Sequence, residues 1–426
     1  MSSNATSRPS RTILANINSD TMAENPTDRY LRAMALPTPR MLWEAEPGDC
    51  VVMLAPCPPH FREYVAHTVG LDVAQVDVVA PAETATVHAL DVAGALGATG
   101  RLADRPVLEP FALDRPVLEF ARRTGVQLYP YSAHPDDSVL ETVRRVNTKS
   151  GIRETVAGLG LPVADGGFAA TRAELVGKLT AFLSDRPAVI VKTDRSSTGF
   201  GNLVIEAGAR ESRARRVQEA LGDGPDPACG WTYEEYLPLT ASPSMEMLCE
   251  DAGVTEYYSC DQRTVDNAWT GMVAPAAEGP WHGELRKAAL LIGDWLHARG
   301  YRGIFDVDCG TYDGGYVVTE ANVRVTGGTF LEKLARRLRP GDAPVHWRAD
   351  SRPGGPGPDF AEALRRIEAA GLADPSAAAR TVLTADTRET DGKWRYLVVG
   401  RDAASVAAAE RETEALLGLG PGSGPG

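Results

Sequence analysis

The 426-residue sequence has few cysteines and histidines, no long apolar run and fewer basic than acidic residues. Its six cysteines contain no CxxC pair and its seven histidines form no HExxH or HxxxH group, so no structural zinc site is expected. The longest apolar stretches, residues 51–57 and 188–191, are far shorter than the roughly 20 residues of a membrane helix. The first residues lack the apolar segment of a secretory signal. These absences predict a cytoplasmic protein with reduced thiols and no membrane partner.

The charge balance and the composition exclude further classes of protein. The 44 basic residues are outnumbered by 57 acidic ones, which gives a net charge of −13 and no electrostatic reason to expect a nucleic-acid partner. An anionic ligand must therefore be held by local cations. The 43% hydrophobic and 24% charged residues are typical of a folded protein. At about 150 residues per domain, the length predicts about three structural units.

Up to about residue 147, short β-branched apolar runs alternate with helical patterns, which is typical of βαβ units around a mostly parallel sheet. The GxGxxG fingerprint of dinucleotide-binding domains is absent after the first expected strand, so no such site is expected. The expected strands are 12–16, 50–55, 76–79 and 127–129, and the expected helices are 62–67, 115–123 and 137–146.

From residue 147 the pattern changes to alternating strands joined by short loops, which favours an antiparallel sheet. The Gly- and Pro-rich segment 351–358 is expected to be a loop, followed by a small α+β segment. The expected strands are 188–192, 203–205, 232–237, 244–248, 255–260, 303–309, 316–321, 381–385 and 394–399, and the expected helices are 152–159, 283–299, 360–370 and 403–417. The predicted organisation is a disordered arm at 1–12, an N-terminal α/β domain at 13–147, a two-part domain at 148–345, a small α+β domain at 346–420 and a disordered tail at 421–426.

A strand lysine followed by a loop of small residues is the strongest local signal. Lys192 ends an apolar strand, and small residues after it would let backbone N–H groups approach an anion, so the segment can close over phosphates. The segment is not a GxxxxGK[ST] loop, and a plain β-hairpin turn with glycines at positive φ explains it equally well. The loop residues concerned are Ser196, Ser197, Thr198, Gly199 and Gly201.

A hairpin that ends in polar residues is the second signal. Asp308 lies on its first strand, and Glu320 and Asn322 share one face of its second strand because side chains alternate. Three such oxygen ligands suit a hard cation such as Mg²⁺. Arg324 lies on the same face if the strand continues, where its planar fork can contact a phosphoryl group. The alternative is a solvated polar face of a sheet.

Two further segments contain candidate ligand-binding residues. Residues 231–237 form a strand that runs into a linker, and a linker backbone can present N–H and C=O groups to an adenine edge beside a glutamate. An edge strand with exposed carboxylates explains this segment equally well. Lys149 supplies another cation just ahead of a helix, although by itself it is more typical of a surface lysine.

In this order, the segments NTKSGIRETVAGLGLPV, AVIVKTDRSSTGFGNLVI, YEEYL, FDVDCG and TEANVRVTGG resemble the ATP-grasp superfamily over residues 147–338. The resemblance implies an α/β ATP-grasp fold, with the nucleotide between two subdomains of 148–345 and a pre-ATP-grasp domain ahead of them. It implies ATP and Mg²⁺ as cofactors, and a reaction that joins a carboxylate to an amine through an acylphosphate. An ATP-grasp-fold kinase and a non-catalytic nucleotide-binding scaffold remain as alternatives.

The resemblance also implies roles for individual residues. Arg324 and Lys192 would be catalytic, and Asp308 is preferred to Asp306 as the first metal ligand because of its spacing to Glu320. Ser242 or Ser244 stands at the position of a ribose-binding carboxylate in many members, which leaves the ribose contact open. The nucleotide would be bound by Lys149, Lys192, the loop Ser196 to Gly201, Glu234, Glu235, Tyr236 and Leu237, and the metal by Asp308, Glu320 and Asn322.

More narrowly, the N-terminal segment, the SPS and CDQ stretches and the C-terminal appendage resemble the ATP-grasp peptide ligases of actinobacterial peptide antibiotic pathways. That resemblance implies an arylglycine-type amino acid as the carboxylate substrate, a peptide amine as the second substrate and a possible homodimer. Because no GxSxG motif occurs, a covalent serine mechanism is not expected. The candidate substrate residues are Arg263, Arg286 and the turn Thr326, Gly327, Gly328 and Thr329, whose amides could receive an acyl or phosphoryl oxygen.

Overall fold

A computed structural model describes the chain except for residues 1–7, 24–25, 197–201, 210–211, 223–225, 266–267, 342–344, 356 and 421–426. The chain forms two compact units. The described residues of Met1–Ser19, Thr27–Asp136 and Arg324–Gly422 form the terminal unit, and those of Asp20–Pro26 and Asp137–Val323 form the central unit. Among the described helices, none is both long enough and apolar enough to cross a membrane.

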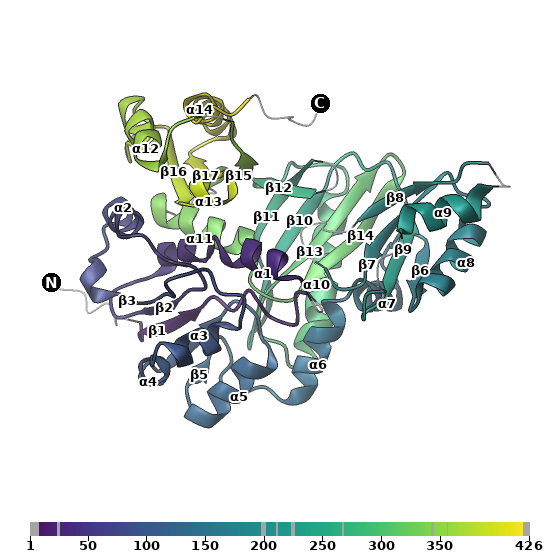
Figure 1. Ribbon diagram of the computed structural model, residues 1–426, viewed down its shortest axis with the longest axis horizontal. Helices are drawn as coiled ribbons and strands as arrows, with labels where there is room; N and C mark the ends of the chain where they lie inside the picture. The colour runs from purple at the N-terminus through teal and green to yellow at the C-terminus, as the bar shows by residue number, and fades with distance from the viewer. Residues whose placement is uncertain are drawn as a thin grey trace. The chain divides into compact units, whose positions relative to one another are not determined.

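A parallel sheet in the strand order β3-β2-β1-β4-β5 forms the first part of the terminal unit, as the sequence predicted (Figure 1). Its central strand begins at Arg11, inside the range assigned to a disordered arm, and buries Ile13 and Leu14. The strands are β1 (Arg11–Leu14), β2 (Cys50–Val52), β3 (Asp77–Val79), β4 (Val107–Pro110) and β5 (Gln127–Leu128). The helices are α1 (Asp28–Ala35), η1 (Thr38–Glu44), α2 (Pro59–Val69), η2 (Val73–Gln75), α3 (Ala89–Ala95), α4 (Thr99–Ala103) and α5 (Arg115–Thr124).

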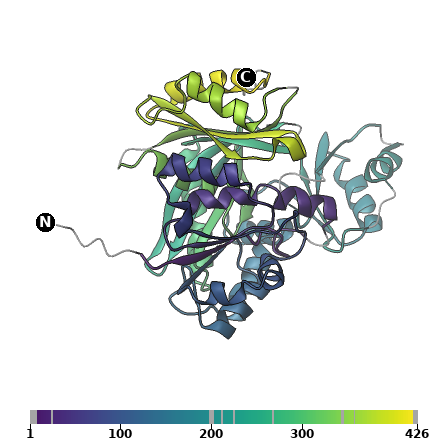
Figure 2. The same cartoon turned by 60° about the vertical axis from the view of Figure 1, so that its left-hand side comes forward.

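The C-terminal part of the terminal unit contains α11 (Gly327–Leu338) and three antiparallel strands, with β17 (Lys393–Gly400) between β15 (His346–Pro353) and β16 (Ala379–Ala385). α14 (Ala403–Leu416) packs on these strands, and Figure 2 shows it beside α12 (Phe360–Ala369). A short helix, α13 (Arg388–Asp391), precedes β17. The prediction of a loop at 351–358 is wrong for its first three residues, because Ser351 to Pro353 pair with β17. Proline is tolerated there because it stands at the end of a strand.

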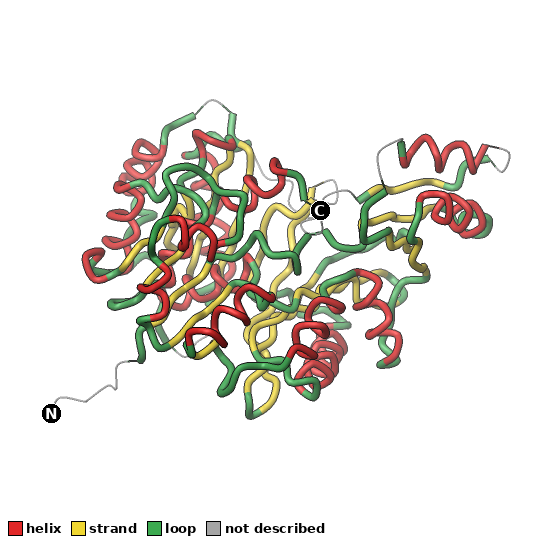
Figure 3. The backbone as a smooth tube through the Cα atoms, turned by 60° about the horizontal axis from the view of Figure 1, so that its bottom comes forward, coloured by secondary structure: helices red, strands yellow, loops and turns green. Residues whose placement is uncertain are grey.

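A four-stranded antiparallel sheet forms one part of the central unit, in the order β6-β9-β7-β8. Helices α8 and α9 pack against it (Figure 3), and Leu175, Leu179 and Val217 share its core with Val189 and Trp231. The elements are β6 (Gly166–Ala169), α8 (Arg172–Phe182), β7 (Ala188–Thr193), β8 (Leu203–Glu206), α9 (Arg213–Leu221) and β9 (Trp231–Glu235).

A second antiparallel sheet of the central unit has the order β14-β13-β10-β11-β12. α10 (His282–His297) packs on β10, β11 and β13, while α6 (Asp137–Val146) packs on α7 (Lys149–Gly158). The strands are β10 (Pro243–Glu250), β11 (Gly253–Val265), β12 (Ala268–Ala274), β13 (Gly303–Tyr312) and β14 (Gly315–Asn322). The antiparallel arrangement predicted after residue 147 is therefore confirmed.

Candidate functional site

Lys192 and Glu234 form a buried ion pair inside the four-stranded sheet. The Lys192 Nζ lies 2.6 Å from the Glu234 Oε2, and both residues are buried. Arg153 of α7 approaches the other oxygen of the same carboxylate, at 3.5 Å from Oε1. The alternative of an edge strand with exposed carboxylates is wrong for Glu234, because β9 lies between β6 and β7. One carboxylate thus faces two cations, which leaves a net positive charge at a site where a ligand anion could bind.

Lys149 is buried, in contrast to the surface position that its local sequence suggested. It is the first residue of α7, whose N-terminus is capped by the Thr148 side chain. Its Nζ lies 2.9 Å from the Ser196 carbonyl oxygen, 3.3 Å from the Ser196 Oγ and 3.4 Å from the Glu320 Oε1. The ammonium therefore joins the start of the small-residue loop to one of the predicted metal ligands. The loop residues Ser197, Thr198, Gly199 and Gly201 lie outside the described residues.

The β13–β14 hairpin brings the predicted metal ligands together. Asp308 lies opposite Glu320 in the register, and Asp306 lies opposite Asn322. The Asn322 Nδ2 donates to the Asp306 Oδ1 at 2.8 Å and lies 3.4 Å from the Asp308 Oδ2, so its carbonyl oxygen is the atom left for a cation. From β11, the Gln262 side-chain amide donates to the Asp308 Oδ1.

The donors of this hairpin fit a hard cation only if the cation brings further oxygen ligands. Among the residues that the structure describes, no three Cys, His, Asp or Glu side chains are grouped closely enough to hold a metal ion. Asp308, Glu320 and Asn322 together provide two carboxylates and one amide oxygen. Such an incomplete set suits Mg²⁺, which keeps water and phosphate oxygens in its coordination shell.

Two thiols beside these carboxylates are expected to be unreactive. Cys260 and Cys309 are buried, and burial together with the negative charge of Asp308 raises the pKa of each thiol above its ordinary value. Because the thiolate is the reactive form of cysteine, these residues are poor nucleophiles. The geometry therefore favours chemistry without a covalent cysteine intermediate.

The condition under which Arg324 would share the face of Glu320 and Asn322 is not met, because the strand stops before it. β14 ends at Asn322, and the next backbone N–H, that of Val323, donates to the Asn147 Oδ1 and not to a neighbouring strand. Arg324 is the first residue of the terminal unit in this part of the chain and is buried. Its Nε makes no hydrogen bond among the described residues. A buried guanidinium whose Nε–H is unused is suited to receive an anionic group.

The turn after Arg324 caps α11. The Thr326 hydroxyl accepts from the N–H groups of Gly328 and Thr329, and the Thr329 hydroxyl accepts from the Thr326 N–H. This capping box does not reach the N–H of Gly327. An Nη atom of Arg40 lies 4.0 Å from the position that a Cβ on Gly327 would occupy. The N-terminus of α11 thus has a second cation close to it, which the sequence did not reveal.

The remaining residues predicted to bind the nucleotide lie at the end of β9 and in the linker that follows it. The Glu235 N–H donates to the Asp165 carbonyl oxygen and the Tyr236 N–H to the Ala188 carbonyl oxygen, so these donors serve the sheet. The Tyr236 side chain is exposed, and Leu237 follows it outside the strand. The Ser242 carbonyl oxygen accepts from the Gln262 N–H at 2.9 Å, which ties the end of this linker to β11.

The two predicted substrate arginines of the central unit differ in their surroundings. Arg263 lies half-buried on β11. The Arg286 side chain is more than half exposed and its Nε lies 2.7 Å from Glu256, as expected for a solvated helix position. Sequence reasoning missed Arg153, although it lies four residues after Lys149, and this spacing places both side chains on one face of α7.

The first turn of α7 is packed too closely at Gly151 to admit a side chain. A Cβ at this position would lie 2.1 Å from the Arg145 carbonyl oxygen and 2.7 Å from the Thr148 Oγ1. Gly→Ala normally stabilises a helix by about 1 kcal/mol, but here we expect Gly151→Ala to destabilise the central unit by about 1–3 kcal/mol through overpacking. Thermal unfolding checks this against Gly177→Ala in α8, where a Cβ meets no atom within 4 Å. Stabilisation by both substitutions would contradict the tight packing at Gly151.

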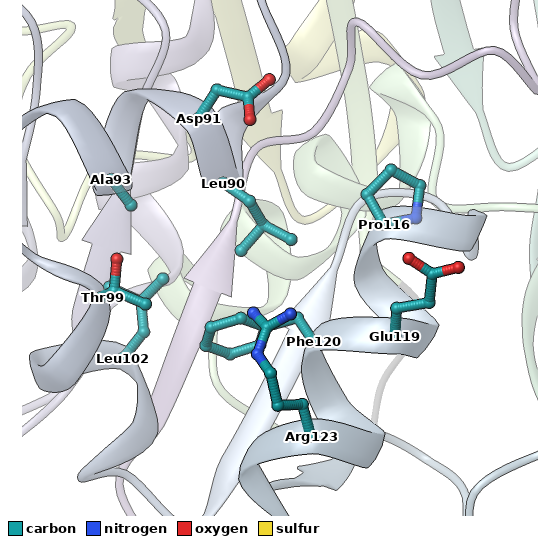
Figure 4. Close-up of a pocket in the computed structure, with 9 residues that line it drawn as sticks. All are labelled: Leu90, Asp91, Ala93, Thr99, Leu102, Pro116, Glu119, Phe120 and Arg123. Carbon is teal, nitrogen blue, oxygen red and sulfur yellow. The ribbon is translucent and has the colours of Figure 1, made fainter.

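A pocket of about 240 Å³ in the terminal unit lies between α3, α4 and α5 (Figure 4). The Arg123 guanidinium lies over the Phe120 ring, and the carboxylates of Glu119 and Asp91 also line the pocket. None of its lining residues belongs to the predicted site, so this pocket carries no part of the predicted chemistry.

Comparisons with known proteins support the fold. A family model described as the pre-ATP-grasp domain matches residues 38–126. Among solved structures, N5-carboxyaminoimidazole ribonucleotide synthetase from Thermus thermophilus is 16% identical with a TM-score of 0.59, and the match covers 97% of this chain and 99% of that one. Biotin carboxylase from Campylobacter jejuni, in a beta-gamma-ATP complex, is 12% identical with a TM-score of 0.59, covering 96% of this chain and 91% of that one. No curated protein matches in the sequence comparison.

A third similar structure was solved with a nucleotide. Carboxyaminoimidazole ribonucleotide synthase from Aspergillus clavatus, complexed with ATP, is 15% identical with a TM-score of 0.56, and the match covers 96% of this chain and 98% of that one. These likenesses show that the chain has the ATP-grasp fold with a pre-ATP-grasp domain. The predicted fold class, an α/β N-terminal domain with a parallel sheet followed by antiparallel sheets, is confirmed.

Proposed function

We propose that the chain is an ATP-dependent ligase that activates a carboxylate as an acylphosphate and joins it to an amine. The observation that carries the proposal is the position of Lys149, a buried ammonium in contact with both Ser196 and Glu320. Ser196 begins the loop proposed to cover phosphates, and Glu320 is a proposed metal ligand. A cation between these two groups suits the triphosphate of a nucleotide, and the ATP-grasp fold supports that interpretation.

In this proposal the central unit binds ATP. Lys149, Lys192 and the loop Ser196 to Gly201 hold the phosphates, and Asp308, Glu320 and Asn322 hold Mg²⁺. Mg²⁺ supplies charge neutralisation between phosphate oxygens when it is bound. Lys192 and Lys149 are each paired with a carboxylate in the described structure, so their side chains are already oriented before a phosphate competes for them. The adenine is assigned to Glu234, Glu235, Tyr236 and Leu237, and the ribose to the region of Ser242.

The carboxylate requires cations of its own, and we assign Arg324 to this role. Its guanidinium would stabilise the phosphoryl group as a carboxylate oxygen attacks the γ-phosphorus of ATP and ADP leaves. The amine then attacks the acyl carbon, inorganic phosphate leaves, and the nitrogen gives up a proton as the amide forms. Within the turn Thr326 to Thr329, the Gly327 N–H, which the capping box does not use, would offer a donor to the acyl or phosphoryl oxygen.

For the substrate class, we propose an arylglycine-type amino acid as the acid and the N-terminus of a peptide as the amine. This assignment is supported by the resemblance to peptide antibiotic ligases, and in particular to the pheganomycin peptide ligase. Arg263 is the better placed of the two central-unit arginines to meet a substrate, because it is half-buried on β11 whereas the Arg286 side chain is more than half exposed. A cytoplasmic homodimer completes the proposal.

The proposal is tested by mass spectrometry of the purified protein with ATP, Mg²⁺, a panel of amino acids that includes arylglycines, and short peptides. The expected result is ADP together with a product lighter than the summed reactants by one water. AMP would indicate adenylation and overturn the acylphosphate route. ADP with a phosphorylated acceptor that resists hydroxylamine would identify a kinase, and ATP binding without turnover over the whole panel would favour a scaffold.

Substitution of Lys192 by Met is expected to lower kcat/KM for ATP at least about tenfold, or about 1.4 kcal/mol. Methionine keeps the apolar stem but removes the ammonium that faces Glu234, so the phosphates lose a cation. Nucleotide affinity and steady-state kinetics provide the measurement, with circular dichroism to establish folding. Lys178→Met is the control, because the Lys178 side chain is exposed and pairs with Glu174 on the surface of α8. Wild-type nucleotide affinity in Lys192→Met would remove this lysine from the site.

A further inference from the structure

Asp194 is a buried carboxylate to which the sequence analysis gave no role. It follows the end of β7 and is 4% exposed. Its Oδ1 accepts from the Ser150 N–H at 2.7 Å and from the Thr232 Oγ1 at 2.6 Å, and its Oδ2 accepts from the Ser150 Oγ at 2.8 Å. Three short hydrogen bonds on one ionised group make a strong and directional anchor.

The backbone of Asp194 is tied to the same elements. Its carbonyl oxygen accepts from the Lys149 N–H at 2.8 Å, and its N–H donates to the Gly230 carbonyl oxygen at 3.1 Å. Side chain and backbone together therefore join the first turn of α7, the end of β7 and the start of β9. These three elements carry Lys149, Lys192 and Glu234.

The anchor matters most for Lys149. An α-helix leaves its first N–H groups without partners inside the helix, and a carboxylate at that end is favoured by the helix dipole. Here Thr148 caps the Gly151 N–H, while Asp194 receives the N–H groups of Lys149 and Ser150. The backbone from which the Lys149 side chain departs is thus held by a residue two positions beyond Lys192.

We infer that Asp194 is a positioning residue for nucleotide binding, which sets the place of the Lys149 ammonium relative to Lys192. The inference rests on the proposed function, since it assigns both lysines to ATP phosphates. The Asp194 carboxylate bonds to Ser150 and Thr232, and its effect on the two ammonium groups therefore passes through the backbone of α7 and β7. A merely structural aspartate would affect stability but would not act through Lys149.

A double-mutant cycle between Asp194 and Lys149 tests this. Asp194→Asn preserves size but removes the charge that fixes the first turn of α7. In the protein that keeps Lys149, we expect Asp194→Asn to raise the ATP dissociation constant at least about fivefold. In the Lys149→Met variant, we expect the same change to raise it less than about twofold. Asp185→Asn, at an exposed position paired with Arg186, is the matched control and should leave binding unchanged in both backgrounds.

A nucleotide-free measurement accompanies the cycle. Hydrogen exchange over residues 149–152 should be faster in Asp194→Asn than in wild type, because the charged acceptor of the Ser150 N–H is lost, while exchange in α10 stays unchanged. If Asp194→Asn does not fold, Thr232→Val replaces it, because this change removes one bond to the Asp194 carboxylate and keeps the others. Its expected effects are smaller and in the same direction.

The outcomes separate the inference from the proposed function. Failure of the folded wild-type protein to bind ATP would contradict the proposed function. If the wild type binds ATP but Asp194→Asn raises the dissociation constant by the same factor with and without Lys149→Met, the positioning role is overturned and the proposed function stands. If Asp194→Asn lowers only the melting temperature, Asp194 is a structural anchor alone, which also overturns the inference.

Discussion

Glu320→Gln is expected to reduce turnover by about a hundredfold or more, because it changes a proposed metal ligand and the partner of Lys149 together. Glutamine keeps the shape of the side chain but removes its negative charge. The Glu320 Oε1 lies 3.4 Å from the Lys149 Nζ, and Glu320 lies opposite Asp308 on the neighbouring strand. The substitution therefore leaves Asp308 as the one carboxylate of the proposed ligand set. It also removes the negative charge beside Lys149, whose Nζ keeps its hydrogen bonds to Ser196.

Turnover measured across a series of Mg²⁺ concentrations tests this prediction. If the loss arises from weaker metal binding, high Mg²⁺ restores part of the activity of Glu320→Gln. Glu284→Gln is the control, since Glu284 is a half-exposed residue of α10 that pairs with Lys287. Unchanged turnover and an unchanged Mg²⁺ dependence in Glu320→Gln would exclude Glu320 from the ligand set.

The two aspartates of β13 differ in their contacts. Asp306 is engaged by both the backbone N–H and the side-chain amide of Asn322, whereas Asp308 lies opposite Glu320 and receives the Gln262 amide. These contacts favour Asp308 as the metal ligand and Asp306 as the residue that orients Asn322. The spacing in the sequence supports the same preference, but it contains no information about Gln262, which arrives from a different strand.

The hairpin and the helices α6, α7 and α10 of the central unit were predictable because their signals are local, whereas α8 and α9 were not among the expected helices. Strand alternation places Glu320 and Asn322 on one face, and the structure has both at the end of β14. The burial of Lys149 was not predictable, because its partner Glu320 lies 171 residues further along the chain. β6, with its two glycines, carries no local strand signal and is held by pairing with β9. Contacts of this kind depend on the folded topology and not on the neighbouring sequence.

The terminal unit shows the same limit more strongly. Its α11 follows the second sheet of the central unit in sequence, yet it packs with η1 near the N-terminus of the chain. Lys333 of α11 lies 2.6 Å from the Glu44 Oε2 and 2.9 Å from the Glu109 Oε1, and Glu109 also pairs with Arg11. Nothing in the local sequence of any of these residues indicates the others.

Lys333→Met is expected to destabilise the terminal unit by about 3–5 kcal/mol, the range found when one partner of a buried ion pair is removed. The two carboxylates are almost fully buried, and both would lose the ammonium that they share, while Arg11 would still pair with Glu109 and the charge of Arg40 would still act on Glu44. Urea unfolding followed by hydrogen exchange of η1 and α11 measures the effect. Lys287→Met is the control, because its ion pair with Glu284 is exposed and such pairs contribute little to stability. A similarly small effect of both substitutions would contradict a stabilising role for the ion pairs of Lys333 with Glu44 and Glu109.

The destabilisation should also depend on pH. Burial opposes ionisation of Glu109, but the attraction of Lys333 and Arg11 is greater and lowers its pKa to about 2. A carboxyl whose pKa is lower in the folded state contributes stability that is present above its unfolded pKa of about 4.3 and is lost as the pH falls toward the folded value. The difference in unfolding free energy between wild type and Lys333→Met should therefore shrink between about pH 5 and pH 2. A constant difference across this window would show that Lys333 does not lower the pKa of the Glu109 carboxyl group.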